Sequence, residues 1–469
     1  MIESRKRKAQ TLYNKGWKIW LLLIFLTPLY GCAQQPPEFL ENVELLKRTT
    51  LTTTAYCSDG SDRARNGQPR FHGPMVARIN SYKGFQYVSY YEANGNIILE
   101  RNEIGSDTWE KLIIPNYRMT SQDRHNKIAL GISKADGVIH LSFDHHNSVT
   151  FNYAKSVSGL ATDPEKFDWS SNLFTLQSNL GLEDNFGLIT YPSFYDIEST
   201  GGLLMYWRTG GAIGGEMNLA RYDPLLKSWT FIGQISSRDG SYNGQKGTRG
   251  PYHAGFVSDN YGKIHVGWLW REAEAQRKKN VNIGNHGISY AQSADGGKTW
   301  VSENGDIVAD LEKGLVMTID NPSGIAIEVP MELDPTNAGF TSIYDQYGHH
   351  LIFLISHLND QKEELFNYLY VRDNKGQWTK YETGLKSGGQ MIAVKNRLLL
   401  FNAGGVFYSK ISDGFKNWVK LEHPFELKKG SVDWDLSRIE EGRVNFVIQY
   451  NPEKIGQPTP VELFELQLN

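Results

Sequence analysis

The sequence predicts an all-β protein that folds as one domain, a seven-bladed β-propeller. Three observations predict this fold class. A polar or glycine-containing turn followed by a short apolar run recurs seven times, and helical periodicity is weak along almost the whole chain. The 469 residues also combine 12% aromatic residues with 46 glycines, a composition typical of many short strands joined by glycine turns.

Each copy of the repeat is a turn followed by apolar or aromatic residues. The seven copies are YKGFQYVSYY (82–91), ADGVIHLSFD (135–144), TGGLLMYWRT (200–209), NYGKIHVGWLW (260–270), QYGHHLIFLIS (346–356), VKNRLLLFNAG (394–404) and EEGRVNFVIQY (440–450). A propeller blade of four strands needs roughly 40–50 residues plus its loops, which fits the spacing of these copies. A β-sandwich or a β-helix is the alternative, and the blade-length spacing disfavours both.

A further motif supports the propeller. The stretch SADGGKTW, Ser293 to Trp300, resembles the Asp-box of sialidase-like propellers. An Asp-box is a hairpin turn in which the Asp and Ser side chains bind turn amides and the Trp packs beneath them. We therefore expect a structural role for this turn.

The N-terminal sequence has a pattern typical of a targeting segment. Basic residues from Arg5 to Lys18 precede the apolar run IWLLLIFLTPLYGC, which is too short to favour a membrane-spanning helix. A small residue before Cys32 resembles a bacterial lipobox, so we predict a signal peptide over 1–32 and lipidation of Cys32; a plain signal peptide is the alternative. Either way we expect export, as an outer-membrane or cell-surface lipoprotein with a lipid anchor in the membrane, or as a secreted protein.

The remaining chain is predicted to hold a tether over 33–50 and the propeller, as the catalytic domain, over 51–469. A formal net charge of −3 does not favour binding to nucleic acid. After removal of the leader only Cys57 remains, so no internal disulfide is expected.

Candidate functional residues occur in three consecutive blades, in segments that contain Gly, Asn or Pro. They are His125, His145 and His146 in the second blade, Tyr191 and Arg208 in the third, and Arg249, Tyr252, His253 and Arg271 in the fourth. Loops and strand ends of successive blades meet around the axis of a propeller, so these side chains could share one site. His140 and His265 lie within apolar strands, and we assign both to the core.

The residue types favour β-elimination on a uronic acid over hydrolysis. His and Tyr can transfer protons, and Arg can hold a carboxylate through two hydrogen bonds. The segments contain neither a nucleophile elbow nor a pair of acid/base carboxylates. Neutralising the uronate carboxylate would stabilise the enolate-like intermediate formed when the C5 proton leaves. Arg beside Tyr is also expected to lower the pKa of the phenol.

These residues resemble those of a known family, the bacterial seven-bladed propeller ulvan lyases, within the wider group of BNR-repeat proteins. The matching stretches are RHNKIALGISKADGVIHLSFDHHN, TYPSF with YWRTGG, GPYHAGF, and NHGISYAQSADGGKTW, from about Arg124 to Trp300. The resemblance implies endolytic cleavage of ulvan, a sulfated algal polysaccharide, at glucuronate or iduronate, to give 4,5-unsaturated products.

The resemblance also implies roles. His125 and Arg208 would hold the uronate carboxylate, Tyr191 would be the main base and acid, and His145 or His146 would be the second proton-transfer group. The family's Asp-x-His-Asn pattern favours His146, although the doubled His leaves both open. Substrate contacts would come from Tyr252, His253 and Asn126, with Arg249 and Arg271 as candidates for sulfate groups.

Some relatives bind a structural metal. With Cys57 alone in the mature chain a Cys-rich zinc site is not expected, and no Asp-rich calcium loop occurs. We therefore predict no cofactor for catalysis and no catalytic metal.

The sequence leaves three other functions as alternatives. An oligosaccharide dehydratase would eliminate water from a terminal uronate by the same chemistry. A sialidase-like hydrolase would need an arginine triad, a Tyr–Glu pair and an Asp acid, which these segments do not supply. A non-catalytic glycan-binding lipoprotein would use the same residues for binding alone.

Overall fold

The computed structural model describes residues 42–211, 214–259, 261–273, 284–321, 324–345, 348–359, 361, 363–402, 404–425 and 429–469. The chain divides into two units, Met1–Phe39 and Leu40–Asn469, and all described residues belong to the second. The predicted signal peptide (1–32) and the lipidation site Cys32 lie outside the described residues. Among the residues described, no helix combines the length and apolar character needed to cross a bilayer.

Antiparallel β-sheets make up the described structure, as predicted for an all-β protein. Seven sheets of four or more strands are formed by the described residues, together with one small sheet of β2 (Cys57–Ser58) and β3 (Gly73–Pro74). The first and second sheets contain β4 (Arg78–Tyr82), β5 (Phe85–Tyr91), β6 (Asn96–Glu103) and β7 (Glu110–Arg118), then β8 (Ala129–Ile132), β9 (Ile139–Ser142), β11 (Asn152–Ser156) and β12 (Phe174–Ser178).

The third and fourth sheets carry extra strands. The third contains β10 (His146–Ser148), β13 (Ile189–Ile197), β14 (Gly202–Thr209), β15 (Met217–Asp223) and β16 (Ser228–Gln234). The fourth contains β17 (Asp239–Tyr242), β18 (Gln245–Ser258), β19 (Ile264–Glu272), β20 (Asn285–Ser293), β21 (Thr299–Val301), β22 (Ile307–Asp310) and β23 (Ile325–Ile327).

The last three sheets have four strands each. They contain β24 (Thr336–Asp345), β25 (Gly348–Leu358), β26 (Leu365–Arg372) and β27 (Trp378–Lys386); β28 (Gln390–Val394), β29 (Arg397–Asn402), β30 (Gly405–Lys410) and β31 (Val419–Leu421); and β32 (Gly430–Asp435), β33 (Arg443–Tyr450), β34 (Thr459–Leu468) and β1 (Val43–Ala55). Single turns of 3-10 helix occur at Ser61–Arg63 (η1), Pro164–Lys166 (η2), Ser171–Leu173 (η3), Asn179–Gly181 (η4), Leu311–Lys313 (η5), Met331–Leu333 (η7), Ile411–Asp413 (η8) and Ile439–Glu441 (η9).

The seven predicted repeats coincide with one strand in each large sheet. They overlap β5, β9, β14, β19, β25, β29 and β33, and each of these is flanked by two strands of its own sheet. A strand in this position is covered on both faces by neighbouring sheets, so nearly every residue is apolar and buried, as in β14, where seven of eight residues are buried. The burial of these strands explains why the repeat is visible in the sequence.

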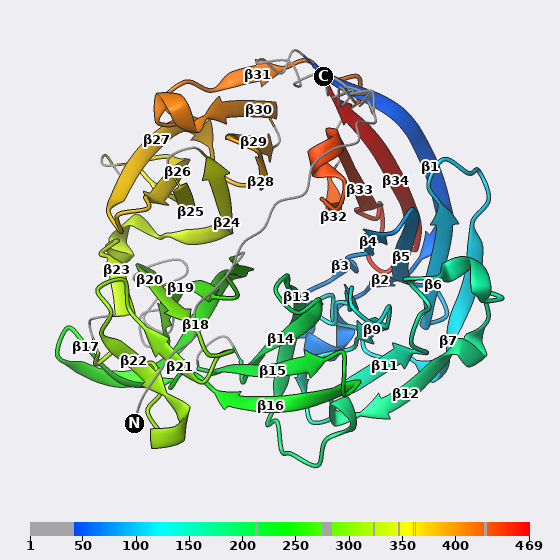
Figure 1. Ribbon diagram of the computed structural model, residues 1–469, viewed down its shortest axis with the longest axis horizontal. Coiled ribbons are helices and arrows are strands. Elements are labelled where there is room, and N and C mark those ends of the chain that lie inside the picture. The colour runs from blue at the N-terminus through cyan, green and yellow to red at the C-terminus, as the bar shows by residue number, and fades with distance from the viewer. Residues whose placement is uncertain are drawn as a thin grey trace, which may run out of the picture. The chain divides into compact units, whose positions relative to one another are not determined.

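Apolar clusters join each sheet to the next within the unit Leu40–Asn469. Among the described residues there are seven such clusters, and each draws its side chains from two successive sheets, including one that joins the last sheet to the first. The sheets follow one another around a ring (Figure 1). Since β4 contacts β8, β8 contacts β13, and β13 contacts β18, the first strands of these sheets lie toward the same axis.

Strand β1 closes the last sheet. It pairs antiparallel with β34, from Val43 opposite Leu468 to Ala55 opposite Thr459. Residues 43–50, which were predicted to belong to the tether, are therefore part of this sheet. The sequence did not reveal the pairing because its partner strand lies at the other end of the chain.

The Asp-box and the core histidines have their predicted structures. Asp295 accepts hydrogen bonds from the amides of Lys298 and Thr299 at 3.0 and 2.9 Å, and Trp300 is fully buried. His140 is fully buried with Nδ1 2.6 Å from the Tyr153 hydroxyl, and His265 is 4% exposed.

The contact between the fourth and fifth sheets gives a stability prediction. A Cβ atom at Gly267 would lie 2.1 Å from Cε1 of Phe353, so Gly267→Ala would overpack this contact. We expect a loss of about 1–3 kcal/mol in the free energy of unfolding, measured by urea denaturation and by Tm. Gly247→Ala, which meets no atom within 4 Å, is the matched control. Equal Tm values for the two variants would contradict the packing described here.

Candidate functional site

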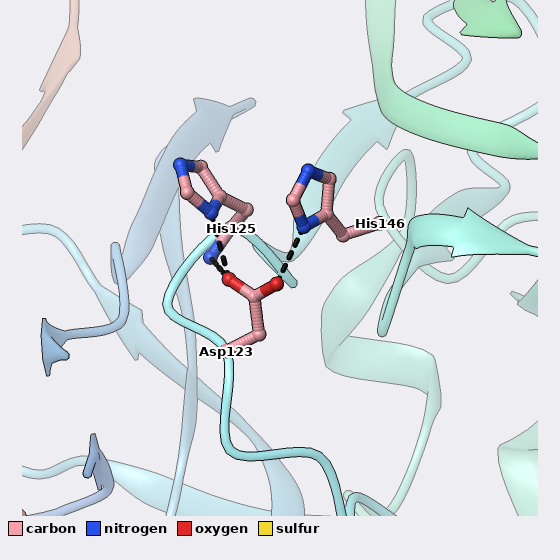
Figure 2. Close-up of side chains that lie close together, drawn as sticks. All are labelled: Asp123, His125 and His146. Atoms are coloured by element: carbon pink, nitrogen blue, oxygen red, sulfur yellow. Dashed lines mark hydrogen bonds and ion pairs between the residues drawn. The ribbon is translucent and has the colours of Figure 1, made fainter. Parts of the chain in front are cut away.

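A buried carboxylate joins two of the predicted histidines. Asp123, which has no exposed surface, lies 2.7 Å from Nδ1 of His125 through Oδ1 and 2.5 Å from Nδ1 of His146 through Oδ2 (Figure 2). The backbone amide of His125 also donates to Oδ1 at 3.0 Å, and Nε of Arg63 donates to Oδ2 at 2.9 Å. The two imidazole rings are 4.5 Å apart between centroids.

The charge of Asp123 determines the tautomer of both histidines. Burial would raise the pKa of this carboxyl group, but hydrogen bonds from His125 and His146 outweigh burial and hold the pKa well below its usual range. An ionised carboxylate only accepts, so Nδ1 of each ring carries hydrogen. Burial lowers the pKa of His125, although Asp123 opposes the shift. His125 is therefore neutral at pH 7 and its Nε2 carries a lone pair.

Two copies of Asp-x-His-Asn form this arrangement, residues 123–126 and 144–147. His146 of the second copy donates to Asp123 of the first, and Nδ2 of Asn126 in the first donates to Asp144 of the second at 2.5 Å. Asn126 is 5% exposed, so this side chain, predicted to contact substrate, instead holds the two copies together.

His145 and His146 have different environments. His145 is fully buried, and its Nε2 accepts the backbone N–H of Asn152 at 2.8 Å. His146 reaches Asp123 and stacks on Tyr191 with 5.8 Å between ring centroids. The structure therefore brings His146 into the site and places His145, also predicted as a catalytic candidate, in the core.

Tyr191 occupies an unusual backbone conformation. Its φ is 55°, in the left-handed region that costs a non-glycine residue on the order of 1–3 kcal/mol. The register of β13 against β14 shifts between Thr190 and Ser193, so Tyr191 and Pro192 oppose a single residue as a β-bulge. The bulge changes the direction of the Tyr191 side chain, whose ring centroid lies 5.9 Å from that of His125.

Burial dominates the acidity of Tyr191. It raises the pKa to about 12, although the Arg208 guanidinium opposes this shift. Arg208 lowers the pKa of the phenol, as the sequence predicted, but the net shift is upward because the cost of removing the phenolate from water exceeds the stabilisation by the nearby charge. Tyr191 is protonated at neutral pH and can donate a proton.

Arg208 is a buried cation beside two aromatic rings. Only 2% of the residue is exposed, and its Nε and Nη1 atoms have no hydrogen-bond partner. Its Cζ lies 5.6 Å from the ring centroid of Tyr191 and 4.3 Å from that of Tyr252. No carboxylate among the described residues forms an ion pair with Arg208. A buried guanidinium with free donors is suited to bind an anion.

Side chains alternate between the two faces of β18 and β19, and this alternation decides which of the remaining candidates face the site. Gly250 pairs with Arg271, and Arg271 covers Tyr252 with 3.5 Å between Cζ and the ring centroid. Arg249 pairs with Glu272, and successive residues point to opposite faces, so Arg249 lies on the other side. Tyr252 and Arg271 therefore join the site.

Arg249 and His253 do not join the site, contrary to the sequence predictions. Arg249 is fully buried and binds Glu272 through two hydrogen bonds of 2.8 and 3.2 Å, so a sulfate group cannot reach it. His253 lies on the same face as Arg249, with Nε2 3.0 Å from the hydroxyl of Tyr195. Burial lowers the pKa of His253 to about 3.

Asp123, His125 and His146 form one of two groups in the described residues that could hold a metal ion. In this group the distances of 2.5 and 2.7 Å are those of hydrogen bonds between the carboxylate and the rings. A metal ion among the same atoms would require both Nδ1 atoms to lose hydrogen.

The sequence analysis missed Asp123 and Arg63. Arg63 binds Asp123 and donates from Nη2 to the backbone oxygen of His146 at 2.8 Å. The twin Asp-x-His-Asn copies could have revealed Asp123, because they align His125 with His146 and both with an Asp two residues earlier. Nothing local marks Arg63, which lies about 60 residues before its partner.

Comparisons with known proteins show the family to which the chain is similar. A family profile described as "BNR repeat-containing family member" matches residues 85–384. The long isoform of ulvan lyase from Pseudoalteromonas sp. (strain PLSV) is 25% identical over 458 residues, covering 85% of this chain and 44% of the relative. The short isoform from Alteromonas sp. (strain LOR) is 26% identical, covering 50% of this chain and 51% of the relative. The resemblance to ulvan lyases is confirmed, and the chain spans about half the length of these curated relatives.

A solved structure has a similar fold. The crystal structure of polysaccharide lyase Uly1 aligns with a TM-score of 0.66 at 17% identity and covers 91% of this chain and 100% of that one. At this identity the similarity concerns the fold alone.

The Asp123 geometry predicts the titration of His125. Because Asp123 raises the pKa of His125 against the effect of burial, Asp123→Asn should lower that pKa further. NMR of imidazole-labelled protein measures the shift, with His146→Gln used for assignment. A pKa of His125 that rises or stays constant in Asp123→Asn would contradict the hydrogen bonds described here.

Proposed function

The chain belongs to the BNR repeat-containing family, and from this premise we propose that its second unit is a seven-bladed β-propeller that cleaves ulvan by β-elimination at a uronic acid. The ulvan lyases among its relatives support the substrate class. The seven large sheets of the described residues, joined in sequence by apolar clusters, support the propeller.

Arg208 is the observation that carries this proposal. A buried guanidinium with two unpartnered nitrogens is costly unless an anion completes it. A uronate carboxylate beside Arg208 would satisfy these donors, and its neutralisation would make the adjacent C5 proton more acidic. His125 can share this role, because an approaching carboxylate raises the pKa of the imidazole and favours its charged form.

Proton transfer is assigned to His146 and Tyr191. His146 donates from Nδ1 to Asp123, so its Nε2 is available to accept the C5 proton. The electron pair of the C5–H bond then forms the C4–C5 double bond as the C4–O4 bond breaks. Tyr191, protonated because its pKa is raised to about 12, gives its proton to O4. Tyr252 and Arg271 line the site beside Arg208, and Arg271 can contact a sulfate group.

The proposed localisation rests on the pattern of the N-terminal sequence. We propose export through the leader 1–32 and membrane attachment through a lipid on Cys32, which would place the enzyme where polymeric ulvan is accessible.

Activity measurements on the full chain test the chemistry. Wild-type protein incubated with ulvan should give products with ultraviolet absorbance from the new double bond. Tyr191→Phe should lower kcat by about 10²- to 10⁴-fold, since a phenol proton is lost. Arg208→Ala should lower kcat/KM by about 10²- to 10³-fold.

Two variants serve as controls. Tyr261→Phe removes the hydroxyl of an exposed tyrosine and His145→Gln changes the buried neighbour of His146, and both should retain kcat. Mass analysis separates chain scission from loss of one water, the product of a dehydratase. A reducing end without a double bond, or no product from folded protein, would refute β-elimination.

The pH dependence tests the role of Tyr191. As an acid it must be protonated, so kcat/KM should stay constant between pH 8 and 10 and fall only as the pH approaches about 12. If Tyr191 were the base, kcat/KM would instead rise about tenfold per pH unit over that range, because the ionised fraction would increase. Steady-state rates measured from pH 8 to 10 distinguish a constant kcat/KM, expected for an acid, from a rising one, expected for a base.

A further inference from the structure

A second group of possible metal ligands lies between the fourth and fifth sheets. Asp259 follows β18, His265 lies in β19, and His349 lies in β25. One ligand atom from each lies within 4.8 Å of the others. Asp259 and His265 are 5% and 4% exposed, and His349 is half-buried, so the group is reachable by solvent only from the side of His349.

Hydrogen bonds outside the group orient two of its members. Oδ1 of Asp259 accepts the amides of Tyr261 and Lys263 at 2.9 and 2.8 Å, which leaves Oδ2 facing His265. Nδ1 of His265 lies 2.7 Å from the hydroxyl of Tyr290, so its Nε2 points toward Asp259. A hydrogen-bond partner on one ring nitrogen is the usual way in which a protein orients a metal-binding imidazole.

Asp259 and His265 do not form a good hydrogen bond with each other at the centre of this group. Nε2 of His265 is 3.6 Å from Oδ2 of Asp259, beyond good hydrogen-bond distance, and it is buried without a hydrogen-bond partner. The ring centroids of His265 and His349 are 5.4 Å apart at an angle of 71°. A buried ring nitrogen without a partner costs free energy that a ligand between the three side chains would recover.

The donor types suit a divalent transition metal ion. Two imidazoles and one carboxylate are common zinc ligands, and the Asp259 carboxylate supplies a negative charge.

We propose that Asp259 Oδ2, His265 Nε2 and a ring nitrogen of His349 bind one divalent transition metal ion such as zinc. Ligands about 2.0–2.2 Å from a tetrahedral zinc ion lie roughly 3.3–3.6 Å apart, which matches the separation of 3.6 Å between Oδ2 and Nε2. Solvent completes the fourth position. The ion links β19 to β25 beside the contact of Gly267 with Phe353, so it stabilises the fourth sheet against the fifth.

Metal content and thermal stability of the full chain test this site. Chelator-treated protein should bind one zinc ion per chain on dialysis, with a rise in Tm, and cobalt should give visible absorption bands typical of tetrahedral nitrogen and oxygen ligands. His349→Ala and Asp259→Asn should each weaken zinc binding by at least about 100-fold and remove the zinc-dependent rise in Tm. Tyr290→Phe should weaken binding by about 10- to 100-fold.

Controls separate this site from the other histidines. The double variant His125→Gln/His146→Gln removes the other group that could hold a metal, and His72→Ala removes an exposed histidine; both should retain one zinc ion and the rise in Tm. Circular dichroism confirms that each variant is folded. Retention of zinc in folded His349→Ala and Asp259→Asn, loss of zinc in the double variant, or failure of wild-type protein to bind zinc or cobalt would overturn the proposal.

Discussion

The buried carboxylate of Asp123 is the constraint on which the candidate site depends. It accepts hydrogen bonds from His125, in a loop before β8, and from His146, the first residue of β10, and so fixes the distance, orientation and tautomer of both rings. Asp123 is ionised and enclosed, and Arg63 also binds it, so a turn of either imidazole would remove one of the hydrogen bonds that satisfy this buried charge. The rings of His125 and His146 lie beside that of Tyr191, with 5.9 and 5.8 Å between centroids, and the backbone of Tyr191 is strained at this point.

Strand geometry separates the candidate site residues of the fourth sheet from residues that pair in its interior. Tyr252 and Arg271 lie on one face of β18 and β19, and Arg249 and Glu272 pair on the other. Arg249 and Arg271 have different partners because they lie on opposite faces of these strands. Glu272 neutralises Arg249, while Arg271 and Arg208 pack on the face of Tyr252. The positive charge of the site therefore comes from the guanidinium groups of Arg208 and Arg271, which form no ion pair with a carboxylate of the described residues.

Each of the two clusters of histidine and aspartate forms where segments from different parts of the ring of sheets meet. His125 precedes the second sheet and meets His146 and Tyr191 of the third, and the group of Asp259, His265 and His349 bridges the fourth and the fifth. Successive sheets pack through continuous apolar clusters, so side chains from neighbouring sheets approach closely with little freedom to rearrange. A ring of sheets thus holds polar clusters at fixed geometry without help from disulfides; Cys57 is buried and free.

The sequence by itself determined the all-β class, the seven strand segments, the Asp-box turn and the burial of His140 and His265, because each depends on residues adjacent in the chain. It also indicated that His125, Tyr191, Arg208, Tyr252 and Arg271 could meet. Only the tertiary structure decided between His145 and His146, paired Arg249 with Glu272, revealed Asp123 and Arg63, and joined β1 to β34. These outcomes depend on register, strand face and packing, which bring together residues far apart in the chain, such as Arg48 and Glu462, 414 positions apart.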